Sequence, residues 1–391
     1  MKDMEHVYNC IGHELKIPNI VGSRGIYLFD EQGKRYMDLE SGVWCISVGH
    51  KNSRINDCIT RQSNILMQAG FCYSNEIVDS AAKAVLDVTN LDGGKCVFLC
   101  SGSEAIEVSR QIARHLTEKP ISMTLHDSYL GAYSSVSERD TGWYTFNWER
   151  CQRCERSEDC DPGCEEFEKI PQGIADFVFE PGSASGYVKF PPKTLIQNIV
   201  KKVRRNSGKI IVNEVTTGVG RTGEWFGYQH YDIEPDMIAI GKGIGNGYPV
   251  SVAVINRATI AELERKPFKY SQSHQNDPLG ASVVQETIEI IESNDLIAEA
   301  KRKGLQFYLQ LESLVDKEII LAVRGRGLMF AMDLANENIA NEIYSKLIER
   351  GMIVGNRGTA FRIDPPLIIT ENEFTEFVKT FKTILSIKKT A

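Results

Sequence analysis

The stretch Met237-Ile-Ala-Ile-Gly-Lys-Gly-Ile-Gly-Asn-Gly-Tyr-Pro249 joins a short apolar run to a turn dense in glycine. An apolar run that ends in glycines is typical of a buried strand whose chain turns tightly at its end. Lys242 stands at that end, with apolar residues before it and little side-chain bulk beside it. Because desolvation disfavours an ammonium group, we expect this lysine to have a lowered pKa, as a Schiff-base amine requires. The alternative is a solvated lysine in a surface turn.

Short apolar runs and helical patterns alternate on either side of this stretch. Helical patterns begin at Ser103 and cover 195–205, and the predicted strands cover 97–100, 121–125, 177–179, 210–212, 237–240 and 250–255. This alternation predicts an α/β fold in which helices flank a mostly parallel sheet. Ligands bind beyond the carboxyl ends of strands in such sheets. Polar residues stand at these ends, namely Ser101, Asp127, Glu180, Asn213 and Lys242.

The pattern changes after about residue 295. A long amphipathic helix over 296–314 precedes strands near 319–323 and 328–334, and helices follow at about 338–350 and 372–387. We expect a smaller α+β domain here, over 295–391, which the N-terminal segment 1–50 joins. The large domain then covers 51–294.

Composition excludes several classes of protein. The chain has 391 residues, 42% hydrophobic and 25% charged, and a net charge of −7. With no long basic run, this charge disfavours nucleic-acid and membrane-surface partners. No apolar stretch approaches the roughly 18 residues of a membrane span, and residues 1–6 lack the apolar core of a signal peptide. A cytoplasmic protein is therefore expected.

Ten cysteines are present, and four of them lie close together in a polar segment at about 148–166. These four are Cys151, Cys154, Cys160 and Cys164. In a reducing compartment, four neighbouring thiols favour a zinc or iron–sulfur site over disulfides. An unmetallated polar loop is the alternative, and in either case the segment is interpreted as an insertion outside the strand pattern.

Ser101-Gly-Ser-Glu-Ala105 joins a predicted strand to a predicted helix. Small residues at a helix N-terminus expose backbone N–H groups and the positive end of the dipole, which favours a phosphate. Together with Lys242 and a polar residue on the intervening strand, this loop supplies a phosphate seat, a Schiff-base amine and a partner for a ring nitrogen. Those are the parts that a pyridoxal-phosphate enzyme requires.

Here the chain resembles a known family, the class III pyridoxal-phosphate aminotransferases of fold type I, which includes enzymes acting on acetylornithine, ornithine and 4-aminobutyrate. The resemblance runs nearly end to end. It includes the hairpin-like segment 25–38, Ser41-Gly-Val-Trp44, the 101–105 loop, Glu214-Val-Thr-Thr-Gly-Val-Gly-Arg-Thr-Gly223, 241–249, Asn276-Asp-Pro-Leu279, 323–329 and Phe361-Arg-Ile-Asp-Pro-Pro-Leu367.

The resemblance implies roles for single residues. Lys242 would bind the cofactor as a Schiff base and then act as general base and acid. The implied cofactor-binding residues are Gly102, Ser103, Tyr129, Glu180, Asn213, Val215, Thr216 and Ser273. Among these, Tyr129 would stack on the pyridine ring, Val215 would pack on its other face, and Ser273 would reach the phosphate across a homodimer interface. Arg362 would pair with a substrate carboxylate, and Trp44 and Tyr73 would line the substrate pocket. The partners would be an amino donor and an oxo acid.

The chain departs from the family pattern at three positions. Asn213 replaces the usual Asp, whose charge keeps the ring nitrogen protonated; an amide can donate to an unprotonated nitrogen or accept from a protonated one. Thr216 stands where many relatives have Gln, and Leu130 where many have His. These changes leave open a racemase or aminomutase, or a cofactor-binding protein without catalysis.

A nicotinamide dehydrogenase is a further alternative, because Gly218-Val-Gly-Arg-Thr-Gly223 is a literal G-x-G-x-x-G after a strand. That fingerprint requires a helix that opens at the glycines. Aromatic residues follow instead, from Trp225 to Tyr231.

Overall fold

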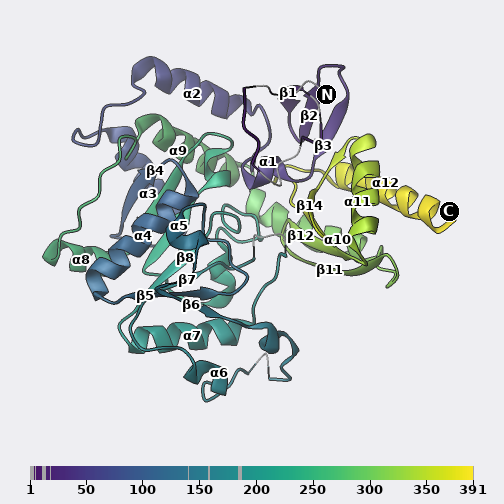
Figure 1. Ribbon diagram of the computed structural model, residues 1–391. Helices are drawn as coiled ribbons and strands as arrows, with labels where there is room; N and C mark the ends of the chain where they lie inside the picture. The colour runs from purple at the N-terminus through teal and green to yellow at the C-terminus, as the bar shows by residue number, and fades with distance from the viewer. Residues whose placement is uncertain are drawn as a thin grey trace.

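A seven-stranded sheet forms the larger part of the molecule (Figure 1). The computed structural model describes residues 4, 6–10, 15–17, 19–139, 141–156, 159–183 and 187–390, with side chains up to residue 386. In spatial order the strands are β4 (Lys95–Leu99), β10 (Ser251–Ile255), β9 (Met237–Ile240), β8 (Lys209–Asn213), β7 (Ile174–Phe179), β5 (Ile121–Leu125) and β6 (Trp143–Phe146). From β9 to β6 all neighbours are parallel, whereas β10 is antiparallel to both β9 and β4. The predicted α/β fold with a mostly parallel sheet is confirmed.

Helices cover both faces of this sheet, as the alternation of side chains along β8 shows. Ile211 belongs to the apolar cluster that includes Ile106 of α4 (Gly102–Thr117). Ile210 and Val212 point to the other face, in the cluster that includes Ile199 of α7 (Lys193–Arg205). Since successive strand residues face opposite sides, a strand buried on both faces needs an unbroken apolar run. The continuous apolar runs of the sequence arise from this burial.

Further helices surround the sheet. These are α2 (Ser53–Ile65), α3 (Glu76–Thr89), α8 (Arg257–Arg265) and α9 (Pro278–Ser293), with the short α5 (Ser134–Ser137) and α6 (Glu165–Glu168). Short 3₁₀ turns follow at η1 (Glu149–Arg153), η2 (Gly227–Tyr231) and η3 (Lys242–Gly245). Among the described residues, none of the helices combines the length and the apolar character needed to cross a membrane.

The C-terminal part begins with α10 (Leu296–Glu312) and contains a second, antiparallel sheet. The C-terminal part continues with β11 (Ile320–Arg326), β12 (Met329–Leu334), α11 (Glu337–Glu349), β13 (Met352–Ile353), β14 (Gly355–Arg357), β15 (Ala360–Ile363) and α12 (Glu371–Thr390). The second sheet has the order β11-β12-β15-β14. N-terminal strands β1 (Ile20–Arg24), β2 (Tyr27–Asp30) and β3 (Arg35–Asp38) form a third sheet, in which β3 pairs with β13. The N-terminal strands therefore lie beside the C-terminal part of the chain, in purple and yellow-green in Figure 1.

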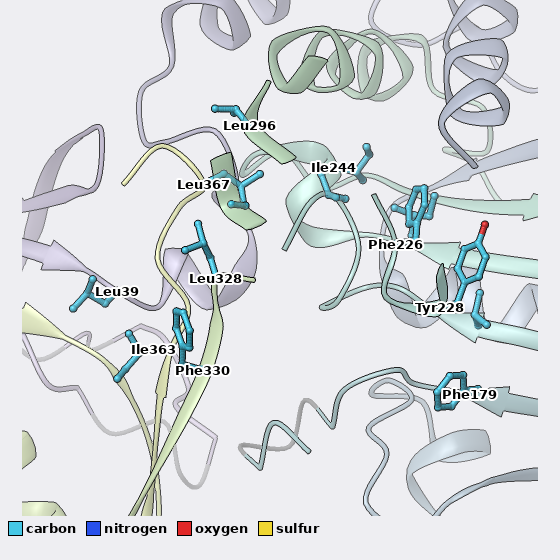
Figure 2. Packing of buried hydrophobic residues seen from close by; sticks show 14 of the residues in the cluster. Leu39, Phe179, Phe226, Tyr228, Ile244, Leu296, Leu328, Phe330, Ile363 and Leu367 are labelled. Carbon is cyan, nitrogen blue, oxygen red and sulfur yellow. The ribbon is translucent and has the colours of Figure 1, made fainter. Parts of the chain in front are cut away.

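One apolar cluster runs from the second sheet to the first. Figure 2 shows part of it, from Leu39 and Ile363 through Leu328 and Leu367 to Ile244. All five side chains are at most 1% exposed. Because interiors pack at crystal-like density, this continuity fixes the C-terminal part against the loop after β9. Lys242 begins that loop.

Gly304 gives a test of this packing. A Cβ at this position of α10 would lie 2.4 Å from the carbonyl oxygen of Gly327, in the β11–β12 turn. Alanine is favoured over glycine inside a helix by about 1 kcal/mol, so any loss reports the contact. We expect Gly304→Ala to lower the free energy of unfolding in urea by about 1–3 kcal/mol. Gly22→Ala, whose Cβ would meet only Phe29 at 3.9 Å, is the matched control. Equal stability of the two variants would contradict this packing.

Candidate active site

The carboxyl ends of the parallel strands open into a cavity of about 350 Å³. Its described lining comes from the loops after β4, β5, β7, β8 and β9 and from one residue near α1 (Ser41–Trp44). The lining residues are Cys45, Cys100, Ser101, Gly102, Ser103, Ile106, Tyr129, Leu130, Gly131, Glu180, Asn213, Val215, Thr216, Lys242, Gly247, Tyr248, Pro249 and Val250. Eight of the residues expected from the sequence thus meet in one place, namely Gly102, Ser103, Tyr129, Glu180, Asn213, Val215, Thr216 and Lys242.

Lys242 is the amine of this cavity. It follows the fully buried β9, and its backbone has a φ of +46°, a left-handed conformation that L-residues seldom adopt. Burial, reinforced by Arg362, lowers the pKa of the Lys242 amine, although the carboxylates of Glu180 and Asp364 oppose this shift. A solvated surface lysine would not experience such burial, so the alternative interpretation of Lys242 is wrong.

The N-terminus of α4 forms one wall. Ser101 and Glu104 close a capping box, in which the Ser101 hydroxyl accepts from the N–H of Glu104 and the Glu104 carboxylate accepts from the N–H of Ser101. The first N–H groups of a helix have no acceptor within it, so those of Gly102 and Ser103 remain available at the positive end of the dipole. This wall suits a phosphate.

Glycine is required where this wall meets the loop after β8. A Cβ at Gly102 would lie 2.6 Å from a methyl group of Val215, and a Cβ at Gly131 would lie 2.8 Å from Ser103 Oγ. Gly241 also packs against this wall, less tightly, because a Cβ there would lie 3.3 Å from the Cα of Gly102. The three glycines bring the backbone close and leave the space between Val215 and Tyr129 open. Tyr129, 45% exposed, has its ring free to cover a flat ligand.

A hydrogen-bond network links the polar residues of the cavity. Asn213 Nδ2 donates to the carbonyl of Tyr129 at 2.9 Å, and Asn213 Oδ1 accepts from the N–H of Val215 at 3.2 Å. One Glu180 oxygen accepts from the N–H of Tyr129 at 2.8 Å, and the other accepts from the Thr216 hydroxyl at 3.5 Å. The network therefore fixes both the Asn213 amide and the Glu180 carboxylate.

A second group of charged side chains lies next to Lys242, around Trp44. The Trp44 ring is 5.1 Å from Lys242 Nζ and 4.0 Å from the guanidinium carbon of Arg362. Arg362 Nη2 donates to Glu40 Oε1 at 2.7 Å. Asp364 is fully buried, and this burial raises its pKa to about 7, although Arg362 and Arg221 act in the opposite direction. Arg362 thus lies between two carboxyl groups.

The turn that carries Trp44 is strained. Ser41, Gly42, Val43 and Trp44 have φ values of +51°, +54°, +59° and +64°. A left-handed conformation costs roughly 1–2 kcal/mol for each residue other than glycine. The Ser41 hydroxyl, which donates to the carbonyl of Asp364, and the Asp38 carboxylate, which accepts from the N–H of Gly42, hold the turn. Strain of this kind is typical of functional sites.

Two expected site residues lie elsewhere on the chain. Ser273 is exposed and does not line the cavity; its carbonyl accepts from Gln68 Nε2 at 2.8 Å. Tyr73, 74% exposed, lines a separate open groove with Phe71 and Asn276. One chain therefore does not bring Ser273 or Tyr73 to Lys242.

The expected metal site in the cysteine segment finds no support. Among the described residues, no group of three or more His, Cys, Asp or Glu side chains is arranged to hold a metal ion. Cys151 and Cys160 pack against the apolar core, whereas Cys154 and Cys164 are exposed, and all four are free thiols. Residues 157 and 158 of this segment lie outside the described residues. The spacing alone does not bring four thiols into a tetrahedron.

Comparison with known proteins identifies the family. A family model described as aminotransferase class-III matches residues 12–385. The chain belongs to the class III aminotransferases. It is 31% identical over 364 residues to acetylornithine aminotransferase of Archaeoglobus fulgidus, covering 91% of this chain and 92% of that protein. It is 26% identical to a [LysW]-aminoadipate semialdehyde/glutamate semialdehyde transaminase of Sulfolobus acidocaldarius, covering 93% and 95% of the two chains.

Solved structures have the same fold as this aminotransferase. The taurine:2-oxoglutarate aminotransferase of Bifidobacterium kashiwanohense, solved with PLP and glutamate, superposes with a TM-score of 0.86 at 22% identity, over 95% of this chain and 92% of that one. The ornithine aminotransferase of Toxoplasma gondii superposes with a TM-score of 0.87 at 23% identity, over 98% and 94%.

The dehydrogenase alternative is wrong for this aminotransferase. Turns follow β8 through residues 215–226, and the next element is the short η2, so no helix opens at Gly218 or Gly220.

Sequence reasoning also missed three residues near Lys242, namely Glu40, Cys45 and Asp364. No local signal marks Glu40, because its partner Arg362 is 322 residues away in the chain. The available signal for Asp364 was its place two residues after Arg362, which puts both side chains on the same side of a strand.

Proposed function

We propose that this aminotransferase uses pyridoxal 5′-phosphate to move an amino group from a carboxylate-bearing donor to an oxo acid. One observation carries the proposal: the buried amine of Lys242, whose pKa is lowered, shares a cavity with the N-terminus of α4. An uncharged amine is the form that condenses with an aldehyde, and the helix N-terminus supplies N–H groups for a phosphate. Family membership supports both roles.

The residues present fit this cofactor. The close approach of Gly102 to Val215, where a Cβ would clash at 2.6 Å, supports a narrow slot for a flat ring. Gly102 and Ser103 would hold the phosphate, Tyr129 and Val215 the two ring faces, Asn213 the ring nitrogen, and Lys242 the aldehyde carbon. Glu180 and Thr216 support Tyr129 in this arrangement. When bound, the cofactor supplies an aldehyde for amines and an electron-withdrawing ring.

Lys242 also moves the proton. Its amine is the basic nitrogen of the cavity, and because burial lowers its pKa, a larger share of it is neutral than of an exposed lysine at the same pH. We infer that Lys242 Nζ takes the proton from the amine-bearing carbon of the donor as a general base and later releases it as a general acid. Trp44, 5.1 Å from this nitrogen, shields it from water.

Arg362 binds the substrate carboxylate in this proposal. Its guanidinium lies over Trp44, whose ring also contacts Lys242, so a substrate can reach both groups. Glu40 already holds Arg362, and an incoming carboxylate has to replace it. The names of the acetylornithine and semialdehyde relatives support a donor that carries its reacting amine at the end opposite the carboxylate.

We propose a homodimer as the working unit. Ser273 and Tyr73 do not reach the cavity of their own chain, and apolar side chains beside Tyr73 are exposed, among them Ile65, Met67 and Phe71. A second copy covering this face would bring Ser273 to the partner's phosphate and Tyr73 to the partner's substrate. Phe71→Asp is expected to produce a monomer in sedimentation equilibrium, and a wild-type mass equal to one chain would contradict the dimer.

We also propose a division into two domains and a cellular location. The pairing of β3 with β13 supports a small domain made of 295–391 and the segment 1–50, packed on a large cofactor-binding domain over 51–294. Ten free thiols support a reducing compartment, and we propose the cytoplasm.

The contact between Gly102 and Val215 gives a test of the cofactor slot. Gly102→Ala would push a methyl group against Val215, so we expect the affinity for pyridoxal phosphate to fall by about tenfold or more. Val215→Ala removes the two methyl groups that cause the clash, and the double variant should recover part of the affinity. Equilibrium dialysis measures both. Unchanged affinity in Gly102→Ala would place the cofactor elsewhere.

A screen of amino donors tests the proposed reaction. The purified protein is supplied with pyridoxal phosphate, one amino donor and 2-oxoglutarate, and formation of glutamate is followed. We expect glutamate only when donor and oxo acid are both present. Product from the donor without an oxo acid would favour racemase or aminomutase chemistry, and cofactor binding without turnover of any donor would favour a non-catalytic protein.

A further inference from the structure

We propose that the amide of Asn213 donates to the ring nitrogen of pyridoxal phosphate and keeps that nitrogen unprotonated. The inference rests on the proposed function and concerns what this site does to the cofactor. Through this hydrogen bond, Asn213 would set the electron-withdrawing power of the ring.

The orientation of the Asn213 amide is fixed by two backbone groups. The carbonyl of Tyr129 can only accept, so the atom 2.9 Å from it must be the Nδ2 donor. The N–H of Val215 can only donate, so the atom 3.2 Å from it must be Oδ1. A flipped amide would set two acceptors together at Tyr129 and two donors together at Val215. Asn213 therefore keeps a single N–H that has no partner in this network.

The charge of the site favours an unprotonated ring. Asn213 is 4% exposed, and a protonated pyridine beside it would lose its hydration while its direct partner is an uncharged amide. Glu180 is the carboxylate among the described lining residues, and its oxygens accept from Tyr129 N–H and the Thr216 hydroxyl. Lys242 adds a cation or a neutral amine to the same cavity, never an anion. An unprotonated ring nitrogen satisfies the remaining Asn213 N–H and introduces no buried charge.

The same contacts explain why aspartate is not an equivalent residue here. A carboxylate at position 213 would place an oxygen 2.9 Å from the Tyr129 carbonyl, where both atoms are acceptors. The loop after β5 would lose the bond that holds Tyr129 over the cavity. Asn213 is thus also a positioning residue for Tyr129. In this proposal the Asn213 amide both holds Tyr129 in place and gives the ring nitrogen an uncharged partner.

The test uses full-length protein loaded with pyridoxal phosphate that carries ¹⁵N in the ring, and NMR gives the nitrogen shift. We expect the wild-type resonance at the position of free, unprotonated cofactor in alkaline solution, and no change over the pH range in which the protein stays folded. A resonance at the pyridinium position near neutral pH overturns the inference but leaves the proposed function intact. Failure of the cofactor to bind at all overturns both.

Asn213→Asp is the paired variant. Its carboxylate should stabilise the protonated form of the ring nitrogen, which takes its proton from solvent, and move the resonance to the pyridinium position; a shift identical to wild type would overturn the inference. A second measurement covers the case in which this variant does not fold. A cofactor analogue with C–H in place of the ring nitrogen should bind wild-type protein about tenfold more weakly, the loss of one hydrogen bond. Equal affinity for the analogue would also overturn the inference.

Discussion

Lys242→Ala is expected to reduce the rate of transamination by about 10⁴-fold or more. The substitution removes the amine that attaches the cofactor and the base that moves the proton, and positioned acid–base groups alone contribute about 10²–10⁴-fold. The rate would be followed as oxo-acid-dependent glutamate formation with the best donor of the screen. Because burial lowers the pKa of Lys242, cofactor attachment to wild type should reach its plateau at a pH below the ordinary pKa of lysine.

Two controls separate this effect from a loss of fold. Lys242→Arg retains a cation but has no amine that condenses with an aldehyde, so it should be as inactive as the alanine variant. Lys201→Ala removes an exposed lysine of α7 and should leave the rate unchanged. Activity in Lys242→Arg within tenfold of wild type would contradict the assigned role.

Arg362→Ala should lower kcat/KM for a carboxylate-bearing donor by about 10²–10³-fold, equivalent to about 3–4 kcal/mol. The variant loses the carboxylate partner and also removes the ion-pair partner of Glu40 and one of the two arginines that act on Asp364. An amine donor without a carboxylate should lose far less. Arg205→Ala, an exposed arginine of α7, is the control. Equal losses for both kinds of donor would show that Arg362 does not recognise the carboxylate.

Glu40→Gln tests the ion pair between Arg362 and Glu40 by changing its carboxylate. The amide competes less for Arg362 than a carboxylate does. We therefore expect KM for the oxo acid to fall by about threefold to tenfold, with a smaller change in kcat. A higher KM in Glu40→Gln would mean that Glu40 orients Arg362 for substrate binding instead of competing with it.

The apolar patterns of the sequence were sufficient to predict the central sheet. Strands β8 and β9 are buried on both faces, so β9 is wholly apolar and the interior of β8, Ile210 to Val212, forms an unbroken apolar run. Strand β6 was missed because it lies at the edge of the sheet, where Thr145 is exposed and the run is mixed. The antiparallel direction of β10 also has no local signal, because a buried strand has the same apolar pattern whether it is parallel or antiparallel to its neighbour.

The site was predictable where chemistry is tied to a local motif. Lys242 stands in a glycine-rich turn after a strand and Gly102 in a short turn of small residues after another, so their place at the carboxyl edge followed from the pattern. Glu40 was not predictable, because its pairing with Arg362 depends on how the N-terminal and C-terminal parts pack. The prediction of a metal site in the cysteine segment found no support for a related reason. The spacing of the cysteines does not determine which of their thiols pack against the core.

Reduction of the reconstituted protein tests the central claim most directly. Protein loaded with pyridoxal phosphate is treated with borohydride, digested and analysed by peptide mass spectrometry. We predict that the cofactor mass is found on the peptide that contains Lys242 and on no other lysine. An unmodified Lys242 in fully loaded protein, or the cofactor mass on a different lysine, would contradict the proposed function.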